Sequence, residues 1–201
     1  MTDRWWGGAP GAGTVPDAHL LAAVDAAFAG SGVVAELVCT HVDRSAATAR
    51  TGVSLRLAAP PADPAALHTA LVRALDGPVL ADPDGARPGD VPVDDPALAP
   101  ARTALHEAST GTGGRVVRFP GSTAVHGRVP VDELLRGTGI DAVVGVGVPV
   151  APADVVDTGS GFLRPQLDGG RLVLLVERAA GGVLKPVEVA DDDRHQCCGG
   201  H

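Results

Sequence analysis

Several residue types that usually build binding surfaces are scarce or missing from this chain. It has no tyrosine, and aromatic residues make up 2% of its 201 positions. Stacked aromatic side chains are the usual platforms for single-stranded nucleic acids, so this scarcity argues against such ligands. The chain also has one lysine, Lys185, and a formal net charge of −8. Because a phosphate backbone is repelled by net negative charge, the composition predicts no nucleic-acid partner.

Long apolar runs are missing as well. No run reaches the roughly 18 apolar residues that span a bilayer, and the first residues, which include the Trp5-Trp6 pair, lack the apolar core of a signal peptide. We therefore expect no membrane partner and a soluble, cytoplasmic protein.

Cysteine is rare and occurs in an odd number. The three cysteines are Cys39, Cys197 and Cys198. Three thiols do not form a disulfide framework, and in a reducing compartment they fit buried thiols or metal ligands better.

Glycine and proline are abundant, with 27 and 17 residues, while hydrophobic residues make up 45% of the chain. The apolar fraction is sufficient for a folded core. Most glycines and prolines fall between periodic segments, where helices stop and strands turn. The composition therefore predicts a loop-rich but globular protein with a core of small residues.

The spacing of apolar residues predicts a set of short elements. Helical spacing indicates three or four helices. The first starts at the N-cap Asp17 and stops at Gly30, and the second is capped by Asp63-Pro64 and ends before Gly77. The others are predicted over about 101–110 and over 131–136. Strands are predicted over 33–43, 53–57, 115–119 and 140–150, and a C-terminal β-hairpin over 171–178 and 183–189. This order predicts an α+β fold with a mainly antiparallel sheet.

The same pattern predicts how the chain is divided. Residues 1–16 are interpreted as an irregular arm and residues 17–190 as a single α+β domain. A linker over 78–100, rich in acidic and turn-forming residues, is the candidate for an internal boundary. Residues 191–201 are interpreted as a separate tail that contains cysteine and histidine.

One strand carries two residues with chemical potential. It reads Cys39-Thr40-His41-Val42-Asp43. Because side chains alternate between the two faces of a strand, Cys39, His41 and Asp43 should project to the same side. A cysteine and a histidine two residues apart on a strand can bind a metal together.

The tail repeats this combination. It reads Arg194-His-Gln-Cys-Cys-Gly-Gly-His201, so every cysteine of the chain has a histidine within three residues. Thiolate and imidazole are the ligands that zinc and copper prefer. The hypothesis is a small metal-binding protein with zinc or copper as its cofactor. Its candidate ligands are Cys39, His41, Cys197, Cys198 and His201.

Simpler interpretations and other functions stay open. Cys39 can be a buried small hydrophobic residue, and the tail can have no role. An enzyme could bind a small anionic molecule through Arg115, His126 and Arg128. A non-catalytic interaction module could use an arm carrying Trp5 and the acidic linker. Whether the protein is an enzyme is not decided by the sequence.

Two further patterns have simple explanations. Gly111-Thr-Gly-Gly resembles a phosphate loop but has no lysine and follows a helix, so a helix C-cap and turn explains it better. His106 and Glu107 could form an acid/base pair, but neighbouring residues on a helix do not face each other.

Overall fold

The computed structural model describes residues 5–11, 15–81 and 95–188. These residues divide into two units, residues 1–118 and 119–201, and each is described by itself. The predicted tail over 191–201 and most of the predicted linker lie outside the described residues. The prediction of a single domain over 17–190 stays a prediction.

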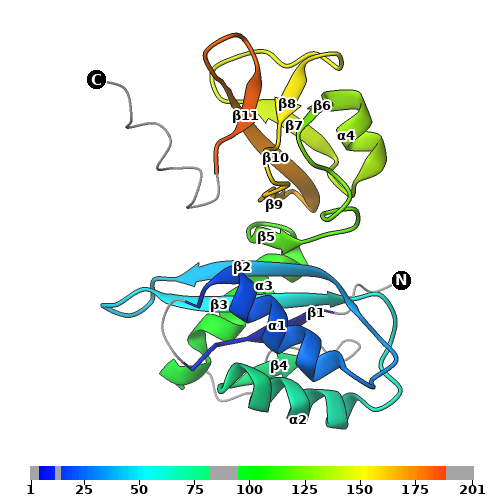
Figure 1. The fold of residues 1–201 in the computed structure, drawn as a ribbon. Coiled ribbons are helices and arrows are strands. Elements are labelled where there is room, and N and C mark those ends of the chain that lie inside the picture. The colour runs from blue at the N-terminus through cyan, green and yellow to red at the C-terminus, as the bar shows by residue number, and fades with distance from the viewer. Residues whose placement is uncertain (1–4, 12–14, 82–94, 189–201) are drawn as a thin grey trace, which may run out of the picture. The chain divides into compact units, whose positions relative to one another are not determined.

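Unit 1 contains one five-stranded sheet with helices on both faces (Figure 1). Its strands and helices, in chain order, are β1 (Trp5–Gly8), α1 (Asp17–Phe28), β2 (Ala35–Asp43), β3 (Arg50–Leu57), α2 (Pro64–Leu75), β4 (Val79–Ala81), the 3-10 helix η2 (Pro96–Leu98), α3 (Ala99–Thr110) and β5 (Arg115–Arg118). The strand order is β4-β1-β3-β2-β5, and every neighbouring pair is antiparallel.

The first six of these strands and helices form a split β-α-β arrangement. Strand β3 lies between β1 and β2, and β1 lies between β3 and β4, so α1 and α2 each connect two strands that are not neighbours. This is the topology of ferredoxin-like folds. Many unrelated functions occur on that topology, so it fixes the positions of side chains but not the activity.

Large apolar side chains join α1 and α2 to one face of this sheet. Helix α1 buries Leu20, Val24 and Phe28, and α2 buries Leu67, Leu71 and Leu75 at helical spacing. They pack against sheet residues that include Trp6, Val38, Val53 and Leu55. The predicted cap of α2 is confirmed, because Asp63 Oδ1 accepts a hydrogen bond from the Ala66 backbone N–H at 2.9 Å.

Helix α3 covers the opposite face with much smaller residues. Its buried positions are Pro100, Ala101, Ala104 and Ala108. Gly7 and Gly52 lie beneath it, and a Cβ at either glycine would collide with a backbone carbonyl oxygen of α3, that of Ala101 or Pro100. The glycines of the sheet and the small side chains of the helix therefore let α3 approach the sheet closely.

The tryptophan pair belongs to the sheet. Residues 5–8 form β1, so the prediction of an irregular arm is wrong for these residues. Trp5 and Trp6 are both buried and lie on opposite faces, with Trp6 in the core beneath α1 and α2. They are therefore not exposed anchors for a partner. This strand could not be predicted from the sequence, because Trp-Trp-Gly-Gly has no alternation of apolar and polar residues.

Unit 2 is a smaller assembly built around one long strand. It contains β6 (Arg128–Pro130), α4 (Val131–Gly137), β7 (Ala142–Gly145), β8 (Val155–Asp157), β9 (Gln166–Asp168), β10 (Arg171–Arg178) and β11 (Leu184–Pro186). Strand β10 pairs antiparallel with β9 and β11 and parallel with β7. The β10–β11 pair confirms the predicted C-terminal hairpin. Strand β7 is shorter than the predicted strand over 140–150, and a turn with Gly147 at φ +69° follows it.

The α+β class is therefore confirmed. The described residues contain the four helices α1 to α4 and a mostly antiparallel arrangement of strands in each unit. Within the described part of the chain, no helix combines the length and the apolar character that crossing a membrane requires.

Candidate functional site

Cys39 and His41 lie on the α3 face of β2, as the alternation of the strand predicts. Antiparallel pairing places Cys39 directly opposite Ser54 of β3 and His41 opposite Gly52. Cys39, His41 and Ser54 are all buried, with exposed fractions of 0%, 3% and 0%. The shared face is confirmed, and the sheet adds the Ser54 hydroxyl between the thiol and the imidazole.

A chain of hydrogen bonds runs through His41. Its Nε2 lies 2.8 Å from Ser54 Oγ, and its Nδ1 lies 2.8 Å from Oε2 of Glu107 on α3. A carboxylate accepts hydrogen bonds, so Nδ1 carries the proton and donates it toward Glu107. Burial lowers the pKa of His41, although Glu107 acts in the opposite direction. The lowered pKa favours the neutral ring. In a neutral ring Nε2 accepts the Ser54 O–H.

Cys39 extends the network on the other side of Ser54. Burial raises the pKa of the Cys39 thiol to about 12, although a hydrogen bond with Ser54 acts in the opposite direction. The group is therefore a thiol at neutral pH. Since the thiolate is the form that attacks electrophiles and binds metals, Cys39 is unreactive in this arrangement.

The turn after α3 closes over this network. Gly111 takes the left-handed conformation at the end of the helix, which confirms the predicted C-cap. Gly113 lies against the Glu107 carboxylate, and Gly114 has φ +131°. A Cβ at Gly114 would lie 2.8 Å from Cε1 of His41. The glycines of this turn therefore allow the backbone to pack directly on the imidazole.

The arrangement of Glu107, His41 and Ser54 resembles the acid-base-nucleophile order of a hydrolase triad. The two distances of 2.8 Å fit that order. A nucleophile must, however, reach its substrate, and Ser54 is fully buried beneath α3. In this conformation the hydrogen bonds of Glu107, His41 and Ser54 satisfy buried polar groups and connect α3 to the sheet. Glu107, at 36% exposure of its side chain, is the one partly exposed residue of the three.

The predicted metal ligands are only partly within the described residues. Cys39 and His41 lie close together, but no group of three or more His, Cys, Asp or Glu side chains suited to a metal occurs in the described part of the chain. Both nitrogens of His41 already have partners, so a metal would have to displace Ser54 or Glu107. Cys197, Cys198 and His201 lie outside the described residues.

Sequence reasoning missed Glu107 and Ser54 as partners of His41. His106, the neighbour with which Glu107 was paired, is exposed, whereas Glu107 points to His41, which is 66 positions away in the sequence. The two strands predicted over 33–43 and 53–57 contained a usable signal, because they are neighbours in the sequence and pair with each other. In the observed register, Ser54 is the polar residue opposite Cys39.

The residues of the predicted anion site are engaged by neighbours. In unit 1, Arg115 pairs with Asp17 at 2.9 Å. In unit 2, Arg128 lies 3.5 Å from Asp157, and both ring nitrogens of His126 lie 3.0 Å from backbone carbonyl oxygens. Arg115 thus belongs to a different unit from His126 and Arg128.

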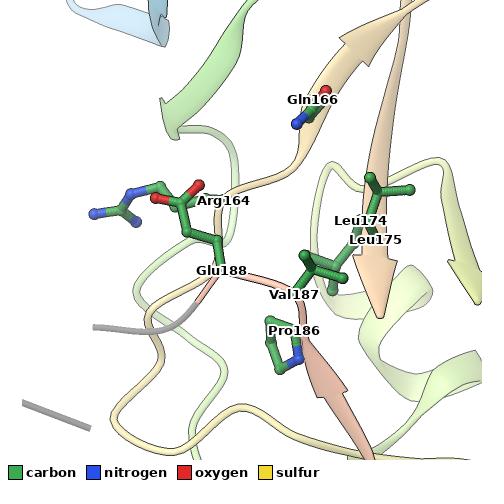
Figure 2. A pocket seen from close by; sticks show the side chains of 7 residues that line it. All are labelled: Arg164, Gln166, Leu174, Leu175, Pro186, Val187 and Glu188. Atoms are coloured by element: carbon green, nitrogen blue, oxygen red, sulfur yellow. The ribbon is translucent and has the colours of Figure 1, made fainter. Parts of the chain in front are cut away.

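Two pockets in the described residues have few features of a ligand or catalytic site. The first, in unit 2, has a volume of about 100 Å³ and lies beside β10 and β11, between Arg164, Gln166 and Glu188 (Figure 2). It is much smaller than the roughly 300–1,000 Å³ of typical ligand sites. The second, of about 330 Å³, lies between the end of α1 and the start of α2 and is lined mainly by alanine. Its one charged residue, Asp63, caps α2.

Comparisons with protein-family models, with curated proteins and with solved structures found no match.

Proposed function

We propose that the protein is a small metal-binding protein that holds zinc or copper. The observation that carries the proposal is the pairing of every cysteine with a nearby histidine, as Cys39 with His41, Cys197 with His195 and Cys198 with His201. Thiolate and imidazole are the preferred ligands of both metals. A cytoplasmic location fits the proposal, because a reducing compartment keeps the thiols free to bind.

The tail supplies the first ligands. Cys39 is a protonated thiol and His41 has two hydrogen-bond partners, so neither is ready to bind a metal. Metal binding requires deprotonated thiols, which a desolvated site disfavours. Cys197, Cys198 and His201 therefore hold the ion initially, and Cys39 and His41 join only after their present hydrogen bonds are exchanged.

The test is metal analysis of the full chain, purified without an affinity tag. Wild-type protein should hold about one equivalent of zinc or copper after dialysis. Cys197→Ala/Cys198→Ala should lose it, while Gln196→Ala, a change in the same segment at a residue that is not a ligand, should retain it. Wild-type protein with far less than one equivalent, or a double variant that binds as well as wild type, contradicts the proposal.

No observation favours a second function. The arginines of the predicted anion site are in ion pairs, and the tryptophans of the predicted interaction arm are buried.

A further inference from the structure

The two faces of the sheet in unit 1 are held by very different contacts. Helices α1 and α2 pack through leucine, valine and phenylalanine side chains, as described above. Helix α3 buries three alanines and Pro100. The stabilisation from burial grows with the apolar area removed from water, and alanine contributes little of it. Helix α3 therefore contributes little apolar side-chain area of its own to its contact with the sheet.

The contacts of α3 also depend on one another. Gly7 and Gly52 allow a close backbone approach along the helix, and the His41–Glu107 hydrogen bond connects its last turns to β2. Attraction between closely packed atoms falls steeply once a gap opens. A displacement that breaks the Glu107 contact therefore also weakens the packing at the glycines.

The surface beneath α3 carries the chemically active residues of unit 1. Cys39, His41 and Ser54 face the helix, and they are buried in its presence. The other face of the sheet holds the large apolar core, which includes none of these three residues. Local opening reactions in proteins involve segments with few apolar contacts and leave the main core intact.

We propose that α3 undocks from the sheet as a unit while the layer of α1 and α2 stays folded, and that undocking exposes Cys39, His41 and Ser54. Helix α3 is thus the cover that controls access to the strand pair. Its role in admitting a metal rests on the proposed function, whereas the undocking itself does not.

Thiol labelling of metal-free protein tests the undocking. In Cys197→Ala/Cys198→Ala, Cys39 is the remaining thiol. With excess Ellman's reagent under native conditions, Cys39 should react much faster than the whole protein unfolds. Glu107→Gln replaces the charge-assisted hydrogen bond from His41 by a weaker neutral one and should accelerate the reaction about threefold to tenfold.

The control is Glu36→Gln, which removes a carboxylate of similar exposure from β2, the strand that carries Cys39. Glu36 is 35% exposed and pairs with Arg56 of β3 at 2.7 Å, not with a residue of α3. This variant should label at the rate of the parent protein. Gly52→Ala, which inserts a methyl group beneath Pro100, should accelerate labelling as Glu107→Gln does.

Tryptophan fluorescence separates undocking from global unfolding. Trp5 lies on the α3 face and Trp6 in the core beneath α1 and α2. In Glu107→Gln, the Trp6 signal, read in a Trp5→Phe background, should match that of the parent. Labelling of Cys39 only at the global unfolding rate, or a Trp6 signal that changes together with labelling, overturns the proposal. Because no metal is present, this result is independent of the metal analysis.

Discussion

At the scale of single residues, His41 determines how the polar network responds to pH. The folded protein surrounds the ring with buried atoms and gives it a carboxylate on one side and a hydroxyl on the other. Desolvation disfavours the charged ring more strongly than Glu107 favours it, so the pKa of His41 in the folded state is lower than its ordinary value of 6.5. The unfolded chain consequently takes up this proton at a higher pH than the folded protein does.

We expect the free energy of unfolding to fall as the pH decreases below 6.5 toward the lowered pKa of His41. In that window the unfolded state binds one more proton, which corresponds to a slope of up to about 1.4 kcal/mol per pH unit. Above pH 6.5 both states have a neutral ring and the contribution is constant. Urea unfolding at several pH values, compared with His41→Gln, measures this slope.

The control for this prediction lies in a different pH range. The hydrogen bond from Arg118 lowers the pKa of Asp25 from its ordinary value of 3.8, so its stabilising contribution disappears only at more acidic pH. Asp25→Asn should therefore keep the slope near pH 6. An identical slope in wild type and His41→Gln would show that another group causes it.

Gly114 supplies a second test at a single position. Its φ of +131° is a conformation that other residues rarely adopt, and a methyl group there would meet His41. Gly114→Ala should destabilise the protein by about 2–4 kcal/mol, from backbone strain plus the steric conflict.

Gly30→Ala provides the matched comparison, because Gly30 also has a positive φ, +80°, but no atoms near the added methyl group. It should cost about 1–2 kcal/mol from strain alone. Chemical denaturation of both variants gives the difference. Equal losses would contradict close packing of Gly114 on the imidazole.

At the scale of elements, the spacing of apolar residues predicted the helices and the longer strands. It did not predict the strands that are too short to show such spacing. Helix α2 could be predicted because Asp63-Pro64 starts it and Leu67, Leu71 and Leu75 repeat at helical spacing. The hairpin of β10 and β11 could be predicted because the turn-forming residues Ala179-Ala-Gly-Gly separate two apolar segments. Strands of three residues, such as β6, β8 and β9, are too short for any period to appear and are formed by pairing with neighbours.

The candidate site shows the same limit. Its β2 part follows from alternation along one strand, which a sequence contains. Ser54 and Glu107 are 13 and 66 positions away from His41, and their approach depends on the register of the sheet and on the docking of α3. The spacing of residues along the sequence therefore does not predict these two contacts.

The cap of α2 gives a prediction at this scale. Asp63→Ala removes the acceptor of the Ala66 N–H and should lower stability by about 1 kcal/mol, while Asp63→Asn should retain most of it. Thermal unfolding of the three proteins measures the difference. A loss in Asp63→Asn as large as in Asp63→Ala would show that the charge, and not the hydrogen bond, stabilises the helix start.

At the scale of the whole molecule, the two units separate the two sources of candidate ligands. Residues 1–118 contain Cys39, His41 and the entire core beneath α1 and α2. Cys197, Cys198 and His201 belong to residues 119–201. Removing the second unit therefore tests whether the strand pair can bind a metal without the tail.

A fragment of residues 1–118 should fold, as judged by buried-tryptophan fluorescence from Trp5 and Trp6 and by cooperative unfolding, because its core is complete. It should bind zinc or copper at least a hundredfold more weakly than the full chain, since its thiol is protonated and its imidazole is engaged. Isothermal titration of both proteins with each metal measures the ratio. A folded fragment that binds as tightly as the full chain would assign the ligands to β2 and α3 and remove the tail from the site.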